Sequence, residues 1–151
     1  MFKGRGFDIE VMNARLKRVA ESEGLPYTER THTYNSRLAQ ELGCWAETQP
    51  GGQAIHDTLF KAYFVDGQNI ADIEILAGLA ESIGLSPVVA RQVLEERHFQ
   101  DTVDADWAKS QVHGITGVPT FAAVGQKLVG AHSYETLEEF LKQLGVGPRE
   151  I

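Results

Sequence analysis

The chain has 151 residues, of which 42% are apolar, enough for one globular domain with a core of its own. Its formal net charge of −7 argues against nucleic acid or an anionic membrane surface as a partner, because phosphate binding needs clustered Lys and Arg. No apolar run approaches the ~20 residues of a membrane span, and the first six residues lack the apolar centre of a signal peptide. The single cysteine cannot form an internal disulfide, and these features together predict a cytoplasmic protein.

Apolar residues at helical spacing predict six helices before residue 114. Residues 1–7 have no such spacing and are interpreted as a disordered leader, and residues 25–33 are too irregular for a strand. The helices are expected to begin, in chain order, at Asp8, Asn35, residue 53, Asp72, Ser86 and Asp101.

The inward faces of these helices follow from the same spacing. The third helix carries aromatic residues beside its apolar stripe, so it is expected to be buried on more than one side. The side chains expected inward include Leu38, Leu42, Trp45, Phe60, Phe64, Val89, Val103 and Trp107.

The last third of the chain has a different pattern. A glycine-spaced loop beginning at Gly114 leads into two short apolar runs separated by Gly125-Gln126, and then into an amphipathic helix over 133–144. This pattern predicts a loop, a β-hairpin and a helix. The predicted fold class is therefore mostly α with a small β-hairpin.

The run Gly-Ile-Thr-Gly-Val-Pro-Thr-Phe at 114–121 resembles the cis-proline loop of the DsbA family of thioredoxin-like proteins. The segments 35–42, 59–64 and 130–137 are similar to the FrnE-like branch, which carries a large helical insertion. The resemblance implies a helical insertion module at 8–97 and a thioredoxin-like ββα remnant at 98–151. It also implies that the family's first strand, Cys-x-x-Cys helix and second strand would precede this sequence, which is interpreted as a family member without its N-terminal third.

The same resemblance supplies the candidate site. In the family, the residue before the cis-proline pairs its backbone with an extended substrate, as an added strand. Here that residue is Val118, Pro119 fixes the geometry and Thr120 begins the strand. We therefore expect a cis Val118–Pro119 peptide, and a peptide or thiol substrate at this edge.

No catalytic residue, cofactor site or metal site is predicted. Counting by helical spacing places Cys44 in mid-helix, on the polar side with Arg37, Glu41 and Thr48, where no helix N-terminus lowers the pKa of its thiol. The histidines show no ligand-like pairing, and His113 is interpreted as a cap at the end of its helix. The acidic residues Glu95, Glu96, Asp101, Asp104 and Asp106 are expected to form a solvated surface.

The leading interpretation is an N-terminally truncated relative of DsbA/FrnE-like protein thiol–disulfide oxidoreductases, inactive as given because it lacks the dithiol. One alternative is a relative of the glutathione-dependent isomerase and kappa-class transferase branch. The other is a non-catalytic peptide-binding or oligomerisation module. Because a two-stranded hairpin leaves an open edge, with Phe121, Val124, Leu128 and Val129 beside it, the chain is also expected to form a homodimer.

Overall fold

The computed structural model describes residues 9–30 and 32–147. The predicted leader at 1–7 and the predicted cap at Asp8 therefore lie outside the described residues. The elements are α1 (Ile9–Ser22), α2 (Arg37–Glu47), the short 3₁₀ helix η1 (Gly52–Ala54), α3 (Ile55–Phe64), α4 (Ile73–Ser82), α5 (Pro87–Glu95), α6 (Gln100–Val112), β1 (Thr120–Ala123), β2 (Gln126–Val129) and α7 (Tyr134–Gln143). The prediction of six α-helices followed by a hairpin and a helix is confirmed for this part of the chain.

The contacts between residues divide the chain into two compact units, Met1–Asp104 and Ala105–Ile151. The division lies within α6. The predicted modules at 8–97 and 98–151 were defined by family resemblance rather than by contacts, and they remain a prediction. Among the helices of the described residues, none is long and apolar enough to cross a membrane.

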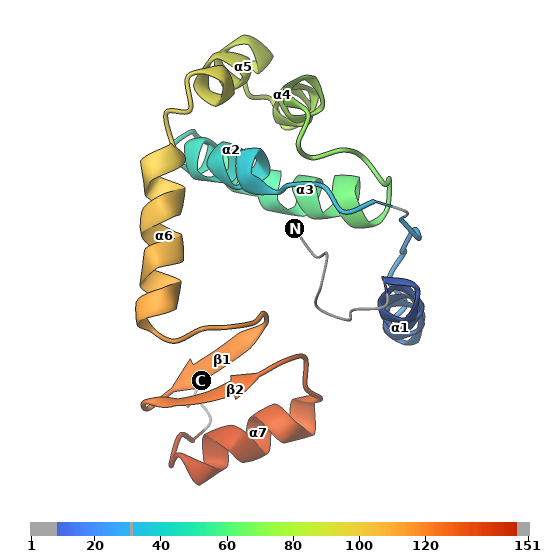
Figure 1. Cartoon of the computed structure of the whole chain (residues 1–151), viewed down its shortest axis with the longest axis vertical. Coiled ribbons are helices and arrows are strands. Elements are labelled where there is room, and N and C mark those ends of the chain that lie inside the picture. Colours follow the sequence, from blue (N-terminus) through green and yellow to red (C-terminus); the bar gives the residue numbers. More distant parts are fainter. Residues whose placement is uncertain (1–8, 31, 148–151) are drawn as a thin grey trace. The chain divides into compact units, whose positions relative to one another are not determined.

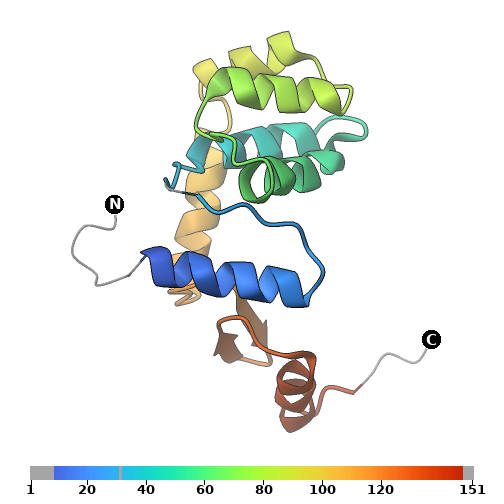
Figure 2. The ribbon, with the colours of Figure 1, turned by 90° about the vertical axis from the view of Figure 1, so that its right-hand side faces the viewer.

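The first unit is built mainly from two layers of helices, with α4 and α5 packed over α2 and α3 (Figures 1 and 2). Its core contains side chains from all four helices, which are closed off from solvent. The fully buried large apolar side chains are Leu42, Ile55, Leu76 and Leu94. The layered packing covers the apolar stripes that the sequence predicted on α2 and α4, and it buries Val93 and Leu94 of the stripe on α5.

Polar caps fix the ends of the α4–α5 pair. The carboxylate of Asp72 accepts hydrogen bonds from the backbone N–H of Glu74 and Ile75, and the hydroxyl of Ser86 accepts one from Val89. These bonds satisfy backbone donors that a helix N-terminus leaves without an intrahelical partner. Both helix starts that the sequence predicted at these caps are confirmed.

Three predicted inward side chains are instead exposed. Phe60 is 64% exposed because the second side of α3 faces solvent, and Val89 is 44% exposed on the first turn of α5. Trp107 is 47% exposed, whereas Val103, one turn earlier on α6, is buried as predicted. The residues next to Trp107 are exposed as well, so this part of α6 has no continuous apolar face.

Helix α1 joins the first unit through polar contacts made with the segment that follows it. The Asn13 side chain donates to the carbonyl of Arg30 at 2.9 Å, and Lys17 pairs with Glu29 at 2.9 Å. Two residues of its predicted apolar stripe, Leu16 and Val19, are 38% and 50% exposed. The helix forms as the spacing predicted, but these two side chains stay partly in solvent.

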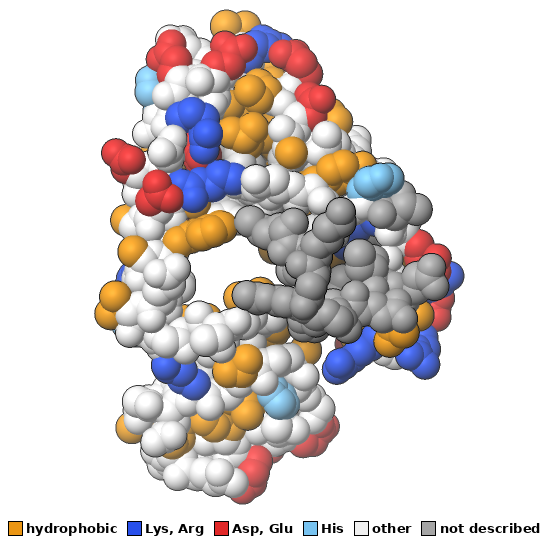
Figure 3. Space-filling model, viewed as in Figure 1, with side chains coloured by type: hydrophobic (Ala, Val, Ile, Leu, Met, Phe, Trp, Pro, Cys, Tyr) orange, Lys and Arg blue, Asp and Glu red, His pale blue; other side chains and the backbone are white. Residues whose placement is uncertain are grey.

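A buried carboxylate links α2 to the start of α6. Glu41 is fully buried, and Arg97 holds it with two hydrogen bonds of 2.9 and 2.5 Å. Arg37 binds the same carboxylate at 3.1 Å, and also reaches the carbonyl of Gln100 and the carboxylate of Asp104. Basic and acidic side chains gather over this start of α6 (Figure 3). Glu41 lies on the side of α2 that the sequence identified as polar, but this side is not solvated at Glu41, because two arginines supply the partners that allow its burial.

The second unit contains the antiparallel hairpin and α7. Thr120 pairs with Val129 and Ala123 with Gln126, which leaves Val124 and Gly125 as the turn. The turn was predicted one residue later, at Gly125-Gln126. Val124 and Gly125 both have positive φ, of 49° and 75°, as in the type I′ turns that match the twist of a two-residue hairpin.

Candidate functional site: the edge before β1

Helix α6 ends as predicted and directs the chain into the proline loop. Gly114 has a φ of 61°, and its N–H donates to the carbonyl of Gln111, while Ile115 donates to that of Ser110. This left-handed residue after the last turn satisfies carbonyls that the helix end would otherwise leave unpaired. His113 Nδ1 lies 2.7 Å from the carbonyl oxygen of Lys109, consistent with its interpretation as a cap. Lys127 of β2 also donates to the carbonyl of His113.

The Val118–Pro119 peptide bond is cis, as the sequence predicted. The loop is held from inside by two contacts. The Thr120 hydroxyl donates to the carbonyl of Gly117 at 2.6 Å, and the carbonyl of Pro119 accepts from the N–H of Gly130 at 2.8 Å. These contacts fix the residues on either side of Val118.

Val118 itself faces outward. Its side chain is 89% exposed, and neither its N–H nor its carbonyl bonds to another residue of the described ranges. A residue whose backbone N–H and C=O are both unpaired can accept hydrogen bonds from, and donate them to, an added strand. The three predicted site residues are therefore adjacent in the loop, and the backbone N–H and C=O of Val118 are without a partner among the described residues.

The hydrogen-bonding direction alternates along β1 and makes this edge continuous. The bond between Gly130 and Pro119 places Pro119 in a pair facing β2, so by alternation Phe121 and Ala123 also face β2. Thr120 and Ala122 then direct their N–H and C=O groups to the opposite side. In the described part of the chain β2 is the only strand beside β1, so that opposite side is an open edge.

A groove lies between β1 and α7. It has a volume of about 440 Å³ and is lined by the four residues of β1 together with Leu137, Phe140 and Leu141. All of these residues are uncharged, and Phe121 is 36% exposed at the groove. An occupant of this groove would therefore present apolar groups and a polypeptide backbone.

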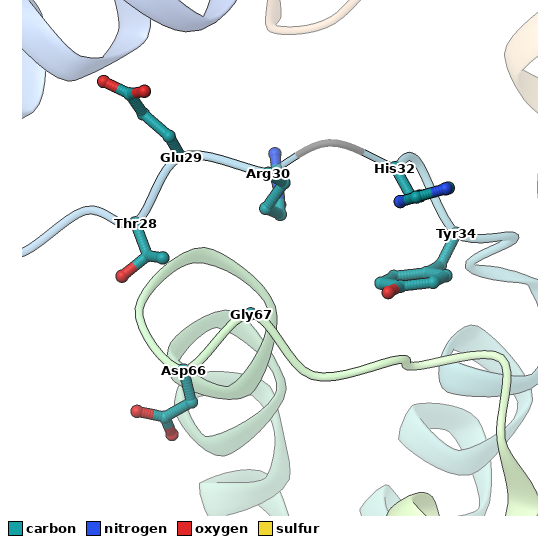
Figure 4. A pocket seen from close by; sticks show the side chains of 7 residues that line it. All are labelled: Thr28, Glu29, Arg30, His32, Tyr34, Asp66 and Gly67. Atoms are coloured by element: carbon teal, nitrogen blue, oxygen red, sulfur yellow. The ribbon is translucent and has the colours of Figure 1, made fainter.

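A second cavity, of about 280 Å³, lies in the first unit beyond the end of α3 (Figure 4). It is lined by Thr28, Glu29, Arg30, His32, Tyr34, Asp66 and Gly67. Arg30 lies over the ring of Tyr63 at 3.7 Å and donates to the carbonyl of the same residue. Thr28 bonds to the carbonyl of Val65, and Glu29 is paired with Lys17 on α1. These contacts hold residues 28–30 against α3 and α1, which is a structural role for these three residues.

Cys44 is half-buried within α2, several residues from its N-terminus. It is therefore away from the partial positive charge at a helix start, which is one of the features that lower a thiol pKa. The acidic side chains at 95, 96, 101, 104 and 106 are exposed as predicted. Among the described residues, no three His, Cys, Asp or Glu side chains are grouped as a metal ion would require.

The helical layers, the hairpin followed by a helix, and the cis-proline loop between them define a thioredoxin-like protein of the DsbA type. The sequence matches the family described as DSBA-like thioredoxin domain over residues 7–142, which is most of the chain. The chain therefore belongs to the DSBA-like thioredoxin domain family, as the resemblance of its loop predicted.

Two relatives extend this assignment. The chain is 33% identical over 109 residues to the Bacillus subtilis (strain 168) protein YwbO, across 72% of this chain and 54% of YwbO. It thus spans about half the length of that curated relative. A solved structure of 2-hydroxychromene-2-carboxylate isomerase is also similar, with a TM-score of 0.74 and 21% identity over 91% of this chain and 67% of that one. At this identity the likeness shows a shared fold.

Two features of the site region were missed from the sequence. The backbone N–H and C=O groups of Thr120 and Ala122 point away from β2 because of the register of the hairpin. That register was missed, because the turn was predicted one residue too late. The groove beside α7 depends on how that helix packs on β1, which leaves its apolar residue Leu141 38% exposed. The absence of charge from 115 to 126 was the available signal for both.

Proposed function

We propose that this chain is the substrate-docking part of a DsbA-like protein thiol–disulfide oxidoreductase, and that it binds an extended polypeptide at Val118, Pro119 and Thr120. The observation that carries the proposal is the unpaired backbone of Val118 at the open edge. A substrate strand would exchange two backbone hydrogen bonds with Val118, while Pro119 and Thr120 keep that residue facing outward.

The role of the chain in this proposal is binding. Dithiol exchange requires an attacking thiolate and a second cysteine that resolves the mixed disulfide. The chain has one cysteine, and it lies in mid-helix on α2 rather than beside the proline loop in sequence. The 151 residues therefore supply the surface that positions a substrate but not the redox pair.

Fluorescence anisotropy with a labelled, extended peptide tests the proposal. We expect saturable binding that Val118→Pro weakens by about tenfold, because this substitution removes the backbone N–H offered to the peptide. Val112→Ala is the matched control, since Val112 is 85% exposed but lies on the last turn of α6. Equal affinity of Val118→Pro and the unsubstituted chain, with both folded by circular dichroism, would contradict the proposal.

Peptide chemistry gives a second, independent arm. In an extended peptide, N-methylation at every second residue removes the N–H donors from one edge. N-methylation at the intervening residues removes them from the opposite edge. Strand addition predicts that only one of the two methylated peptides loses affinity, because a strand pairs through one edge at a time. Equal loss for both peptides would indicate binding through side chains.

A relative of the isomerase branch is the second candidate, supported by the shared fold with 2-hydroxychromene-2-carboxylate isomerase. This candidate predicts that glutathione, rather than a longer peptide, binds to the chain. Competition by glutathione against the labelled peptide distinguishes the two. The isomerase branch would be favoured if glutathione fully displaced the labelled peptide at concentrations at which an unlabelled peptide without cysteine does not.

A further inference from the structure

We propose that Lys127 of β2 is a positioning residue for the peptide site, because its ammonium group holds the start of the loop that presents the backbone of Val118. The inference rests on the proposed binding of an extended polypeptide at Val118. Lys127 acts through the carbonyl of His113, to which it donates a hydrogen bond where the loop leaves α6, and not by contact with the peptide.

Lys127 satisfies a backbone acceptor that the end of α6 leaves over. The last carbonyls of a helix have no partner within the helix. The N–H groups of residues 113–115 bond to the carbonyls of residues 109–111, whereas the carbonyl of His113 accepts from Lys127. The partial negative charge at a helix C-terminus also favours an ammonium group there. Lys127 therefore caps α6 from the neighbouring strand.

A glycine leaves room for this contact. A β-carbon on Gly114 would lie 3.1 Å from Nζ of Lys127, which is closer than an ordinary contact. Gly114 has a φ of 61°, so it both turns the chain at the end of α6 and leaves space for the ammonium group beside the start of the loop. The position of Lys127 is thus supported by the hydrogen bond to His113 and by the space at Gly114.

The loop lies along β2 and is held at three points. Lys127 and Val129 are two positions apart on this strand, so their side chains share one face of the hairpin. A β-carbon on Gly117 would lie 3.5 Å from Cγ1 of Val129, so the middle of the loop approaches the same face. At the end of the loop, the N–H of Gly130 bonds to the carbonyl of Pro119. The start is the point at which one side-chain substitution can release the loop without removing a backbone hydrogen bond.

This anchor contributes to peptide affinity through the conformation of the loop. A site that is already held in its binding conformation loses less conformational entropy when a ligand binds. Without the ammonium group, the loop from Gly114 onward would sample more conformations, and fewer of them would present Val118 to a strand. Because Lys127 is exposed, water can replace part of its hydrogen bond, so the expected loss of affinity is several-fold rather than complete.

Fluorescence anisotropy of the whole chain with the labelled, extended peptide tests this role. Lys127→Met should weaken binding by about three- to tenfold, and Lys127→Arg should restore most of the affinity, because a guanidinium keeps the charge and the N–H donors. Lys109→Met is the matched control and should bind normally, since it removes the same charge from an exposed position on the last turn of α6. Unchanged affinity of Lys127→Met, or a Lys127→Arg chain that binds as weakly as Lys127→Met, would overturn the proposal.

The charge of the peptide separates positioning from direct contact. The same measurements are made with an uncharged peptide and with a variant of it that carries two aspartates. A positioning role predicts the same fold loss for both peptides when Lys127 is replaced by Met, because the anchor acts on the loop. A loss confined to the acidic peptide would show that the ammonium group contacts the ligand, and the proposal would fail.

Amide hydrogen exchange of the peptide-free chain tests the anchor independently of binding. Lys127→Met should accelerate exchange several-fold at Ile115, whose N–H bonds to the carbonyl of Ser110 at the start of the loop, and leave Leu128 of the hairpin unchanged. Unchanged exchange at Ile115 would contradict the proposal even if binding were weakened. Absence of peptide binding by the wild-type chain would contradict the proposed function alone, because the exchange measurement still decides whether Lys127 holds the loop.

Discussion

The buried carboxylate of Glu41 gives the sharpest test of how the first unit is held together. Glu41 accepts two hydrogen bonds from Arg97 and one from Arg37, with its side chain only 1% exposed. Glu41→Gln keeps the shape but replaces one acceptor oxygen by an amide that faces arginine donors. We expect a loss of about 2 kcal/mol in the free energy of unfolding, below the ~3–5 kcal/mol for breaking a fully buried pair, because both arginines retain contact with water.

The matched control is Glu74→Gln. Glu74 also binds one arginine through two hydrogen bonds, both of 2.6 Å to Arg91, but its side chain is 68% exposed. Solvent screens an exposed pair, so this substitution should lower the free energy of unfolding much less than Glu41→Gln does. The comparison keeps the bidentate geometry and changes the burial.

Urea unfolding followed by tryptophan fluorescence measures both effects. Trp45 is 5% exposed and lies one turn from Glu41, and a Trp107→Phe background makes it the only tryptophan in the chain. The reasoning would be refuted if Glu41→Gln lowered the free energy of unfolding by less than about 0.5 kcal/mol, or if both substitutions lowered it equally.

The difference in unfolding free energy between wild type and Glu41→Gln should depend on pH in a definite direction. Hydrogen bonds from Arg97, and then those from Arg37, lower the pKa of Glu41 from its ordinary value of 4.5, although burial opposes them. A carboxyl whose pKa is lower in the folded state contributes its full stability above the unfolded pKa, and loses it as the pH falls through the folded value. The stability difference between wild type and Glu41→Gln should therefore be constant above about pH 5.5 and shrink below 4.5.

Three further predictions follow from individual positions. Gly52→Ala should destabilise the protein by more than about 2 kcal/mol, because an added Cβ would lie 1.8 Å from the carbonyl oxygen of Ala46. Gly78→Ala on α4, where an added Cβ would meet nothing within 4 Å, should instead stabilise it by about 0.5 kcal/mol; equal shifts of the two melting temperatures would contradict this packing. Val124→Asn should stabilise by about 1 kcal/mol, since Val124 has a φ of 49° that Asn tolerates better, and an unchanged melting temperature would argue against this turn. The chain should not catalyse insulin reduction, and turnover that disappears in Cys44→Ser would show that one thiol suffices.

The sequence predicted most of the fold because its signals were local. Asp72 and Ser86 are helix caps whose effect reaches three residues, and Gly114 ends α6 through its own backbone conformation. The proline loop was found by its resemblance to a family motif, and the structure confirmed the cis peptide before Pro119.

The misses depended on contacts between distant residues. Glu41 is an acidic residue on a helix, and only the approach of Arg97, 56 positions later, makes its burial possible. Phe60 and Trp107 were assigned inward from helical spacing, but no periodicity says which side of a helix another helix will cover. The groove beside β1 likewise depends on how α7 crosses the hairpin.

The central claim is that an extended polypeptide pairs with the backbone of Val118. Amide ¹H–¹⁵N spectra recorded during titration with the extended peptide test this claim residue by residue. The account predicts that the amide of Val118 shifts most and becomes protected from hydrogen exchange, because it changes from a free N–H at the loop surface to a strand-paired donor. Shifts confined to the cavity lined by Arg30, His32 and Tyr34, with the amide of Val118 unchanged and still exchanging freely at saturation, would contradict it.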